Sequence, residues 1–225
     1  MAVLGVDGWQ LGWVGARLDG RTVQLLDLRT APEVLAVPGV EVVAVDMPIG
    51  LSEDGVRACD LAARRRLTPF GAASSVFPAP VRAVLATDDY AEARALSRAA
   101  TTPPRAPSAQ TFQLVRSIRA LDDALGDPPP ERVVEVHPEL TFRLGLGGVP
   151  DRKGTARGTV QRLAALRAVM DVEAALADAP LGVPVVDALD ACAAAWSAQR
   201  LADGVAECVG DGTSDSRGRP MRICW

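Results

Sequence analysis

The first fifty residues carry the hydrophobic pattern of β-strands separated by short polar breaks. Three apolar or alternating runs predict strands: residues 2–7, 12–18 and 22–28. Asp7-Gly8 and Asp19-Gly20 are pairs typical of tight turns, so we expect them to join these strands. Three consecutive strands joined in this way form an antiparallel meander.

A fourth apolar run, residues 40–46, follows a short helical segment at residues 32–37. A connection through a helix allows a strand to lie parallel to a neighbour in the same sheet. We therefore expect this strand to extend the meander into a mixed sheet and to end at Asp46.

The pattern then becomes helical, with proline- and glycine-rich breaks at residues 101–107 and 126–131. Four helical segments are predicted: residues 56–67, 78–86, 89–99 and 108–125. The chain returns to a strand at residues 131–139, which would be the fifth strand of the sheet. Residues 52–131 are therefore predicted to be a helical insertion between strands four and five.

The last third of the chain is predicted to close the domain with helices. Its segments are a glycine-rich basic loop at residues 145–158, helices at 159–176 and 187–202, and a final strand or tail at 219–225. The whole pattern predicts one α/β domain, residues 1–225, built on a mixed five-stranded sheet.

Composition narrows the classes of function. The net charge of −4 and the pI of about 5.1 disfavour broad, non-specific nucleic-acid binding, which depends on phosphate neutralisation. No apolar run reaches the roughly 20 residues that span a bilayer, and the first residues lack a secretory signal pattern, so we expect a cytoplasmic protein. Four scattered cysteines and one histidine predict no zinc site and no disulfide framework, but four thiols in a reducing compartment.

Acidic residues end the predicted strands and begin the last predicted helix. If the first and fourth strands are parallel neighbours, Asp7 and Asp46 lie at the same carboxyl edge, on strands about 4.8 Å apart. Period-2 alternation puts Glu135 on one face of the fifth strand, and Asp187 and Asp190 are three apart on one helix face.

Crowded carboxylates either share protons or hold a metal ion. Oxygen ligands without a cysteine or histidine cluster favour Mg²⁺ or Mn²⁺. Two such ions about 4 Å apart are a common device for phosphodiester hydrolysis, because they activate water and stabilise the leaving oxygen.

Each acid also has a purely structural interpretation. Asp7 fits a hairpin turn, and Asp46 fits an Asx turn at a strand end. Glu135 can face water from an edge strand. Asp187 with Asp190 is also typical of a helix N-cap followed by an acid at the third helical position.

Seven motifs resemble, in order, those of a family of predicted ribonuclease H-like nucleases, which has also been described as a domain of unknown function. They are GVDGW at 5–9, VDMPIGL at 45–51, RACDLAARRRL at 57–67, SVFPAPVRAVL at 75–85, SAQTFQLVRSI at 108–118, EVHPELTF at 135–142 and DALDACAAAW at 187–196. The resemblance spans nearly the whole chain and implies a ribonuclease H-like fold.

The resemblance also implies roles for four acids. Asp7 and Asp46 match the family's acids on strands one and four, Glu135 matches the glutamate of its EVHPE motif, and Asp190 matches its late-helix aspartate. The chain departs from many relatives at residues 151–158, where DRKGTARG replaces a lysine-rich stretch.

Several other residues are candidates for contact with a substrate. They are Arg64, Ser75, Phe77, Gln110, His137, Lys153 and Arg157, with Arg57, Arg65 and Arg66 as further basic candidates on the same segment as Arg64. A solvated helix face is the alternative for the arginines, core packing for Phe77, and a local hydrogen bond for His137.

These observations predict a Mg²⁺- or Mn²⁺-dependent phosphodiesterase or nuclease. Asp7, Asp46, Glu135 and Asp190 would be catalytic and, with Asp187, would hold the metal. The expected substrate is nucleic acid or a small phosphorylated molecule. A nucleotide-binding or phosphotransfer protein, or a non-catalytic scaffold of the same fold, remains an alternative.

Overall fold

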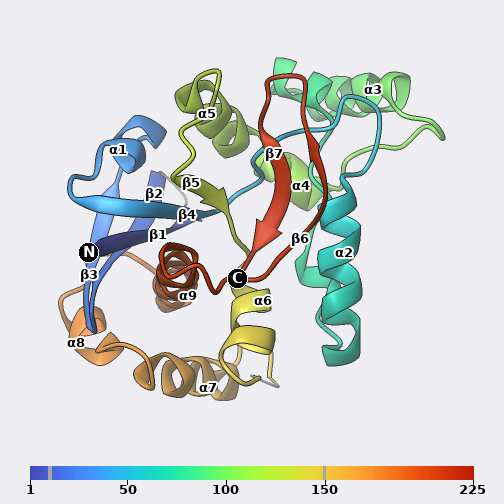
Figure 1. The fold of residues 1–225 in the computed structure, drawn as a ribbon. Coiled ribbons are helices and arrows are strands. Elements are labelled where there is room, and N and C mark those ends of the chain that lie inside the picture. Colours follow the sequence, from blue (N-terminus) through green and yellow to red (C-terminus); the bar gives the residue numbers. More distant parts are fainter. Residues whose placement is uncertain (10–11, 149–150) are drawn as a thin grey trace. The chain divides into compact units, whose positions relative to one another are not determined.

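The computed structural model describes residues 1–9, 12–148 and 151–225 (Figure 1). The chain forms two units. The first contains Met1–Met47, Glu131–Cys208 and Cys224–Trp225, and the second contains Pro48–Pro130 and Val209–Ile223. Among the described residues, no helix is long and apolar enough to cross a membrane.

The first unit is built on a mixed five-stranded sheet with the strand order β3-β2-β1-β4-β5. Its strands are β1 (Ala2–Trp9), β2 (Gly12–Asp19), β3 (Thr22–Leu28), β4 (Val40–Asp46) and β5 (Val133–Glu135). The meander β1-β2-β3 is antiparallel, whereas β4 lies parallel to both β1 and β5. The predicted α/β fold with a mixed sheet is confirmed.

The predicted turn at Asp7-Gly8 is wrong. Asp7 pairs with Val14 and Gly8 with Trp13, so both residues belong to β1. The ladder to β2 continues past the Asp-Gly pair because a glycine also accepts extended backbone. The connection between the strands falls on residues 10–11, outside the described residues.

Helices of the first unit lie around the sheet, and the longest of them packs on it. They are α1 (Ala31–Ala36), α6 (Pro138–Leu140), α7 (Ala156–Arg167), α8 (Val172–Ala177) and α9 (Val185–Ala202), with a π-helical turn at Thr141–Gly145. The predicted helix 159–176 is two helices. Met170 between them is fully buried and the Asp171 N–H donates to the Arg21 carbonyl at 2.9 Å, so tertiary contacts turn the chain there.

Helix α9 packs directly on the sheet, against β1, β2 and β4 (Figure 1). The closest approach is at Gly5 in β1, where an added Cβ would lie 1.9 Å from the Ala195 N and 2.3 Å from the Ala191 O. Only a glycine on the strand and alanines on the helix allow this contact. The close packing sets the position of the acidic residues at the start of α9.

The C-terminal residues form a two-stranded sheet of β6 (Cys208–Ser214) and β7 (Pro220–Cys224). Cys208 and Cys224 form a disulfide with Cα atoms 4.0 Å apart, whereas Cys59 and Cys192 are free and buried. The prediction of four free thiols is therefore wrong. The pairing depends on a hairpin that brings together two residues 16 positions apart, and the sequence pattern did not predict β6.

We expect reduction of this disulfide to lower the free energy of unfolding by about 1–3 kcal/mol, since a loop of this length constrains the unfolded chain by about 3 kcal/mol and strand pairing remains. Urea unfolding with and without dithiothreitol measures the loss. The Cys208→Ser/Cys224→Ser variant should not respond to the reductant. Four titratable thiols in the denatured protein without reductant would contradict the disulfide.

The second unit is mainly helical. Its helices are α2 (Ala58–Leu67), α3 (Tyr90–Ala100), α4 (Ala109–Gln113) and α5 (Val115–Leu125), with short 3₁₀ helices at Thr68–Phe70, Ala73–Ser75 and Arg82–Ala86. The predicted helix 78–86 is thus shorter, and its first residues, which include Pro78 and Pro80, are not helical. The predicted helix 108–125 is divided at Leu114 into α4 and α5.

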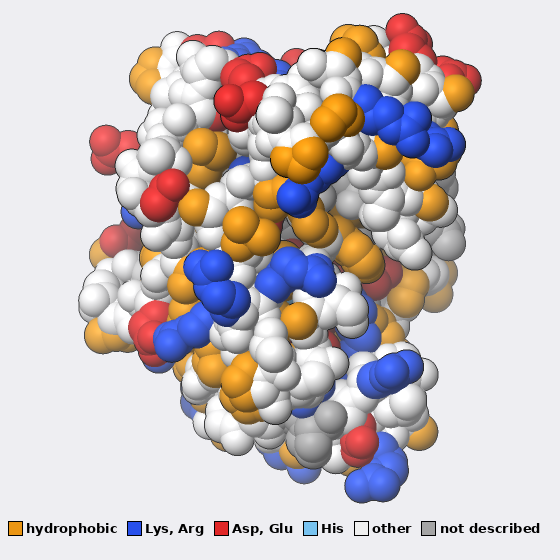
Figure 2. All heavy atoms as spheres, turned by 90° about the vertical axis from the view of Figure 1, so that its right-hand side faces the viewer, with side chains coloured by type: hydrophobic (Ala, Val, Ile, Leu, Met, Phe, Trp, Pro, Cys, Tyr) orange, Lys and Arg blue, Asp and Glu red, His pale blue; other side chains and the backbone are white. Residues whose placement is uncertain are grey.

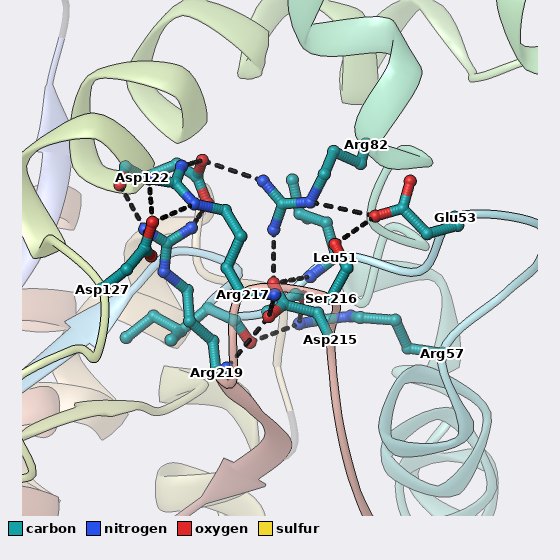
Figure 3. A network of polar contacts seen from close by, with 12 residues as sticks. Leu51, Glu53, Arg57, Arg82, Asp122, Asp127, Asp215, Ser216, Arg217 and Arg219 are labelled. Carbon is teal, nitrogen blue, oxygen red and sulfur yellow. Dashed lines mark hydrogen bonds and ion pairs between the residues drawn. The ribbon is translucent and has the colours of Figure 1, made fainter.

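An ion network joins separate segments of the second unit (Figure 3). The enclosed carboxylate of Asp215, between β6 and β7, accepts from the Leu51 N–H at 3.0 Å and pairs with Arg82. Arg82 also donates to Asp122 of α5 at 3.0 Å, and Asp122 pairs with the buried Arg219. The network therefore attaches the turn of the hairpin to α5 and to the segment around Leu51.

Candidate acidic site at the carboxyl edge of the sheet

Two aspartates lie side by side near the carboxyl ends of β1 and β4. The two strands are parallel neighbours, and Asp7 pairs in register with Asp46. In a parallel pair, residues in register direct their side chains to the same face. Gly5 of β1 faces α9, and by the two-residue alternation of the strand Asp7 faces the same side. The predicted meeting of these strand ends is thus present in the sheet.

Helix α9 brings two more aspartates to this edge. Asp190 is 2% exposed and precedes Ala191, whose carbonyl lies at the close contact with β1. Asp187 lies one turn earlier, and the charges of both residues act on the pKa of Asp7. Asp187 is not the helix N-cap, because the helix begins at Val185 with Pro184 in that position.

Lys153 provides a positive charge in this acidic cluster. Its Nζ lies 2.7 Å from the Asp190 Oδ2, and the Lys153 side chain is 50% exposed. Burial lowers the pKa of Lys153, but the charge and hydrogen bond of Asp190, together with the charges of Asp46 and Asp7, outweigh burial and raise the pKa above its ordinary value. Lys153 was predicted as a substrate contact, and the structure places it among the acids.

The electrostatics of the cluster favour protonation of its carboxylates. Burial raises the pKa of Asp7 well above its ordinary value, and the charges of Asp46 and Asp190 raise it further. Burial also raises the pKa of Asp46 to about 6. Burial raises the pKa of Asp190 as well, although its bond to Lys153 acts against this. When all of these carboxylates are ionised, they carry more negative charge than the one ammonium of Lys153 neutralises.

Glu139 is a charged neighbour that the sequence did not single out. It is 9% exposed and accepts from the Arg143 Nε at 3.1 Å, and its other oxygen pairs with the buried Arg162. Its charge adds to the burial that raises the pKa of Asp46. The only sequence signal is the spacing of four residues between Glu139 and Arg143, which is common to ion pairs on helices.

His137 caps a helix, whereas Glu135 lies in the sheet on the face opposite Asp46. The Nδ1 of His137 accepts from the Glu139 N–H at 3.2 Å, and His137 caps α6. Glu135 pairs with Val45, one residue before Asp46, while Val134 packs in the core that includes α9. By strand alternation, Glu135 points to the face opposite Asp46 and α9.

The remaining basic candidate of the first unit, Arg157, lies in the first turn of α7. Its side chain is 84% exposed, and its Nε lies 3.3 Å from the Asp151 Oδ2. A pocket of about 340 Å³ is lined by Ala156, Arg157, Val160 and Gln161. Residues 149–150 of the predicted basic loop lie outside the described residues.

The other predicted contacts belong to the second unit. The Arg64 Nη1 donates to the Val76 carbonyl at 2.6 Å, and the Ser75 Oγ donates to the Ala72 carbonyl at 2.8 Å. Phe77 is 43% exposed and Gln110 is exposed, so Phe77 is not a core residue. The structure does not place these four residues relative to the acidic cluster.

Arg57 is buried and is not part of a solvated helix face. It is 2% exposed, and its Nε donates to the Asp60 Oδ2 at 3.2 Å while its Nη1 donates to the Gly50 carbonyl at 3.1 Å. Asp60 is buried as well. This arginine is therefore committed to the interior of the second unit, and its place before α2 had suggested exposure.

The fold and the site define an α/β protein with a cluster of aspartates at the carboxyl edge of a mixed sheet. Residues 5–214 match the model of a family described as "Protein of unknown function (DUF429)", so the chain belongs to this family. No curated protein and no solved structure matches the chain.

Proposed function

We propose that the protein is a Mg²⁺- or Mn²⁺-dependent phosphodiester hydrolase, most directly a nuclease. The observation that supports this proposal is the cluster of Asp7, Asp46 and Asp190, whose pKa values are raised by burial and, for all but Asp190, by the neighbouring aspartates. Such crowding costs stability unless protons or a cation compensate it. A divalent cation bound by these carboxylates would offset the cost.

The strand order supports a ribonuclease H-like assignment of the fold. The sheet has the order β3-β2-β1-β4-β5, with acids on β1 and β4 and an acid pair on a late helix. This is the layout that the resemblance of the sequence motifs implies. We propose this assignment together with the function, since sheets of this kind also support other chemistry.

The donor chemistry of the cluster fits a hard divalent cation. Among residues 1–9, 12–148 and 151–225, no three acidic, histidine or cysteine side chains are already arranged as a metal site. Carboxylate oxygens and excess negative charge are nonetheless what Mg²⁺ and Mn²⁺ require. Asp7, Asp46 and Asp190 would hold the ion, with Asp187 at the rim. Glu135 is left out of this set because its side chain points to the other face.

The residues of the chain have separable roles in this proposal. When bound, the cation supplies charge neutralisation at a phosphate and lowers the pKa of water. Asp7 and Asp46 orient the reacting groups from the rigid strand ends. Lys153, on a loop, can donate a hydrogen bond to a phosphate oxygen.

The charge pattern on one face and the net charge favour contact with few phosphates. On the face in Figure 2, lysine and arginine side chains form separate groups with apolar and acidic side chains between them. The net charge of −4 points the same way, since broad nucleic-acid surfaces are basic. We therefore propose nucleic acid held through a short segment, or a small phosphorylated molecule, as the substrate.

Purified protein is expected to cleave at least one of RNA, DNA, hybrid, branched DNA or a chromogenic phosphodiester in the presence of Mn²⁺ but not with a chelator. Asp46→Asn should lose this activity. The matched control is Asp19→Asn, at an aspartate whose side chain is 57% exposed at the far end of β2. Wild-type protein that is inert on every substrate with Mn²⁺ would overturn the proposal.

A further inference from the structure

Lys153 is the only lysine of the chain, and its ammonium group contacts the most enclosed carboxylate of the acidic cluster. The Asp190 side chain is 2% exposed, whereas that of Lys153 is 50% exposed. The lysine therefore reaches a buried acid from the solvent side. The electrostatic influence of Lys153 extends to Asp7, Asp46 and Asp187 as well.

The loop that carries Lys153 is held by specific bonds. The Asp151 N–H donates to the Gln161 Oε1 at 3.0 Å, and the Gln161 Nε2 donates back to the Asp151 Oδ2 at 2.8 Å. The buried Arg162 donates to the Asp151 carbonyl at 3.1 Å. Lys153 is thus supported on the side of Asp151 by two residues of α7.

The end of this loop that leads into α7 is also held by hydrogen bonds. The Thr155 side chain caps α7 by accepting from the Gly158 N–H at 3.0 Å, and its hydroxyl donates to the Arg152 carbonyl at 2.8 Å. A Cβ at Gly158 would lie 2.0 Å from that carbonyl oxygen, so only glycine allows this approach. Bonds on both sides of Lys153 therefore restrict where its backbone can lie.

An ammonium is a compact point charge, unlike the planar guanidinium that supplies the other 23 basic side chains of the chain. The Lys153 ammonium occupies the position beside Asp190 that a metal ion would occupy. It also supplies part of the positive charge that the ion would supply. The two strand aspartates, Asp7 and Asp46, remain as a pair on the other side of the cluster.

We propose that Lys153 is a built-in counter-cation that takes the place of one metal ion, so that the cluster of Asp7, Asp46 and Asp190 binds a single divalent cation instead of two. This inference rests on the proposed function, because it concerns the same site. In such a site the Lys153 ammonium donates a hydrogen bond to a phosphate or leaving oxygen, the task that a second ion performs elsewhere.

Calorimetric titration with Mn²⁺ tests the inference. Wild-type protein is expected to bind one Mn²⁺ per chain, and Lys153→Met is expected to bind two, with the first bound about tenfold more tightly because a nearby positive charge is gone. Lys153→Arg keeps the charge and should still bind one. Arg157→Met, in the first turn of α7, is the matched control and should also bind one.

Electron paramagnetic resonance of the bound Mn²⁺ gives a second readout. Isolated ions in the wild type should show resolved hyperfine structure, and neighbouring ions in Lys153→Met should show a broadened, spin-coupled signal. If Lys153→Met fails to fold, Lys153→Gln, a shorter polar replacement, serves instead.

The outcomes separate the two proposals. Two tightly bound, spin-coupled ions in the wild type would overturn the role of Lys153 while leaving a metal-dependent hydrolase in place. An unchanged stoichiometry of one in both Lys153→Met and Lys153→Gln would also overturn it. Absence of Mn²⁺ binding in the wild type and in every variant would instead overturn the proposed function.

Discussion

Replacing Asp7 by asparagine is expected to abolish phosphodiester cleavage and, at the same time, to stabilise the metal-free protein. The activity falls because the variant lacks a charged metal ligand. Metal binding contributes several kcal/mol of transition-state stabilisation, so the rate should fall on the order of a thousandfold. The stability rises because asparagine has nearly the same shape and carries no charge into the cluster of Asp46 and Asp190.

The stabilisation has a defined dependence on pH. Burial raises the pKa of Asp7 in the folded protein well above 3.8, so the folded state binds more protons than the unfolded chain. The contribution of protonated Asp7 to the stability of the wild type is therefore fully present below the pKa of Asp7 in the unfolded chain. This contribution is lost as the pH rises through the pKa of Asp7 in the folded protein. Asp7→Asn should exceed the wild type by about 1–3 kcal/mol near pH 8 and by little near pH 4.

Urea unfolding in the presence of a chelator across this pH range measures the difference. Asp19→Asn, at an exposed aspartate of β2, is the control and should show no such trend. Added Mn²⁺ should stabilise the wild type and not Asp7→Asn. A variant that is less stable than the wild type near pH 8 would show that Asp7 is a structural residue.

Gly5→Ala is expected to be the most destabilising single substitution at the sheet. The new Cβ would lie 1.9 Å from the Ala195 N, so either the backbone of α9 or that of β1 must move. Atoms inserted at a packed contact lower the free energy of unfolding by about 1–3 kcal/mol. The loss is at or above the upper end of this range when the inserted atoms clash with backbone. A loss of about 3 kcal/mol corresponds to a melting temperature lower by about 6–12 °C.

Thermal unfolding followed by circular dichroism checks the loss of stability. Gly154→Ala is the matched control, because an added Cβ at Gly154 meets nothing within 4 Å. Displacement of α9 also moves Asp190 away from the strand ends, so Gly5→Ala should lose Mn²⁺ binding as well. A melting temperature within a degree or so of the wild type would contradict the tight contact between α9 and β1.

The sheet could be predicted because each of its strands carries its own signal. Ala2 to Val6 and Val40 to Val45 are short apolar runs, and the helical segment between the meander and β4 allows a parallel neighbour. The same reasoning predicted that Asp7 and Asp46 would meet. Local turn signals were less reliable. Asp7-Gly8 lies within β1, because pairing with β2 outweighs the preference of an Asp-Gly pair for a turn.

Two other misses depend on contacts between distant residues. The disulfide between Cys208 and Cys224 requires the hairpin, and the break after α7 requires contact with Arg21. The register between β4 and β5, which sets the face of the sheet that Glu135 occupies, also depends on pairing between distant segments.

The sequence by itself determined the strands of the sheet, their order along the chain and the aspartates near the carboxyl ends of β1 and β4, because hydrophobic periodicity is a local property. Only the tertiary structure decided that Lys153 lies against Asp190, that Glu139 is buried between two arginines and that Gly5 sets the depth of α9. These features depend on packing distances of a few ångströms between segments far apart in the chain, and such distances follow from the way the whole unit packs.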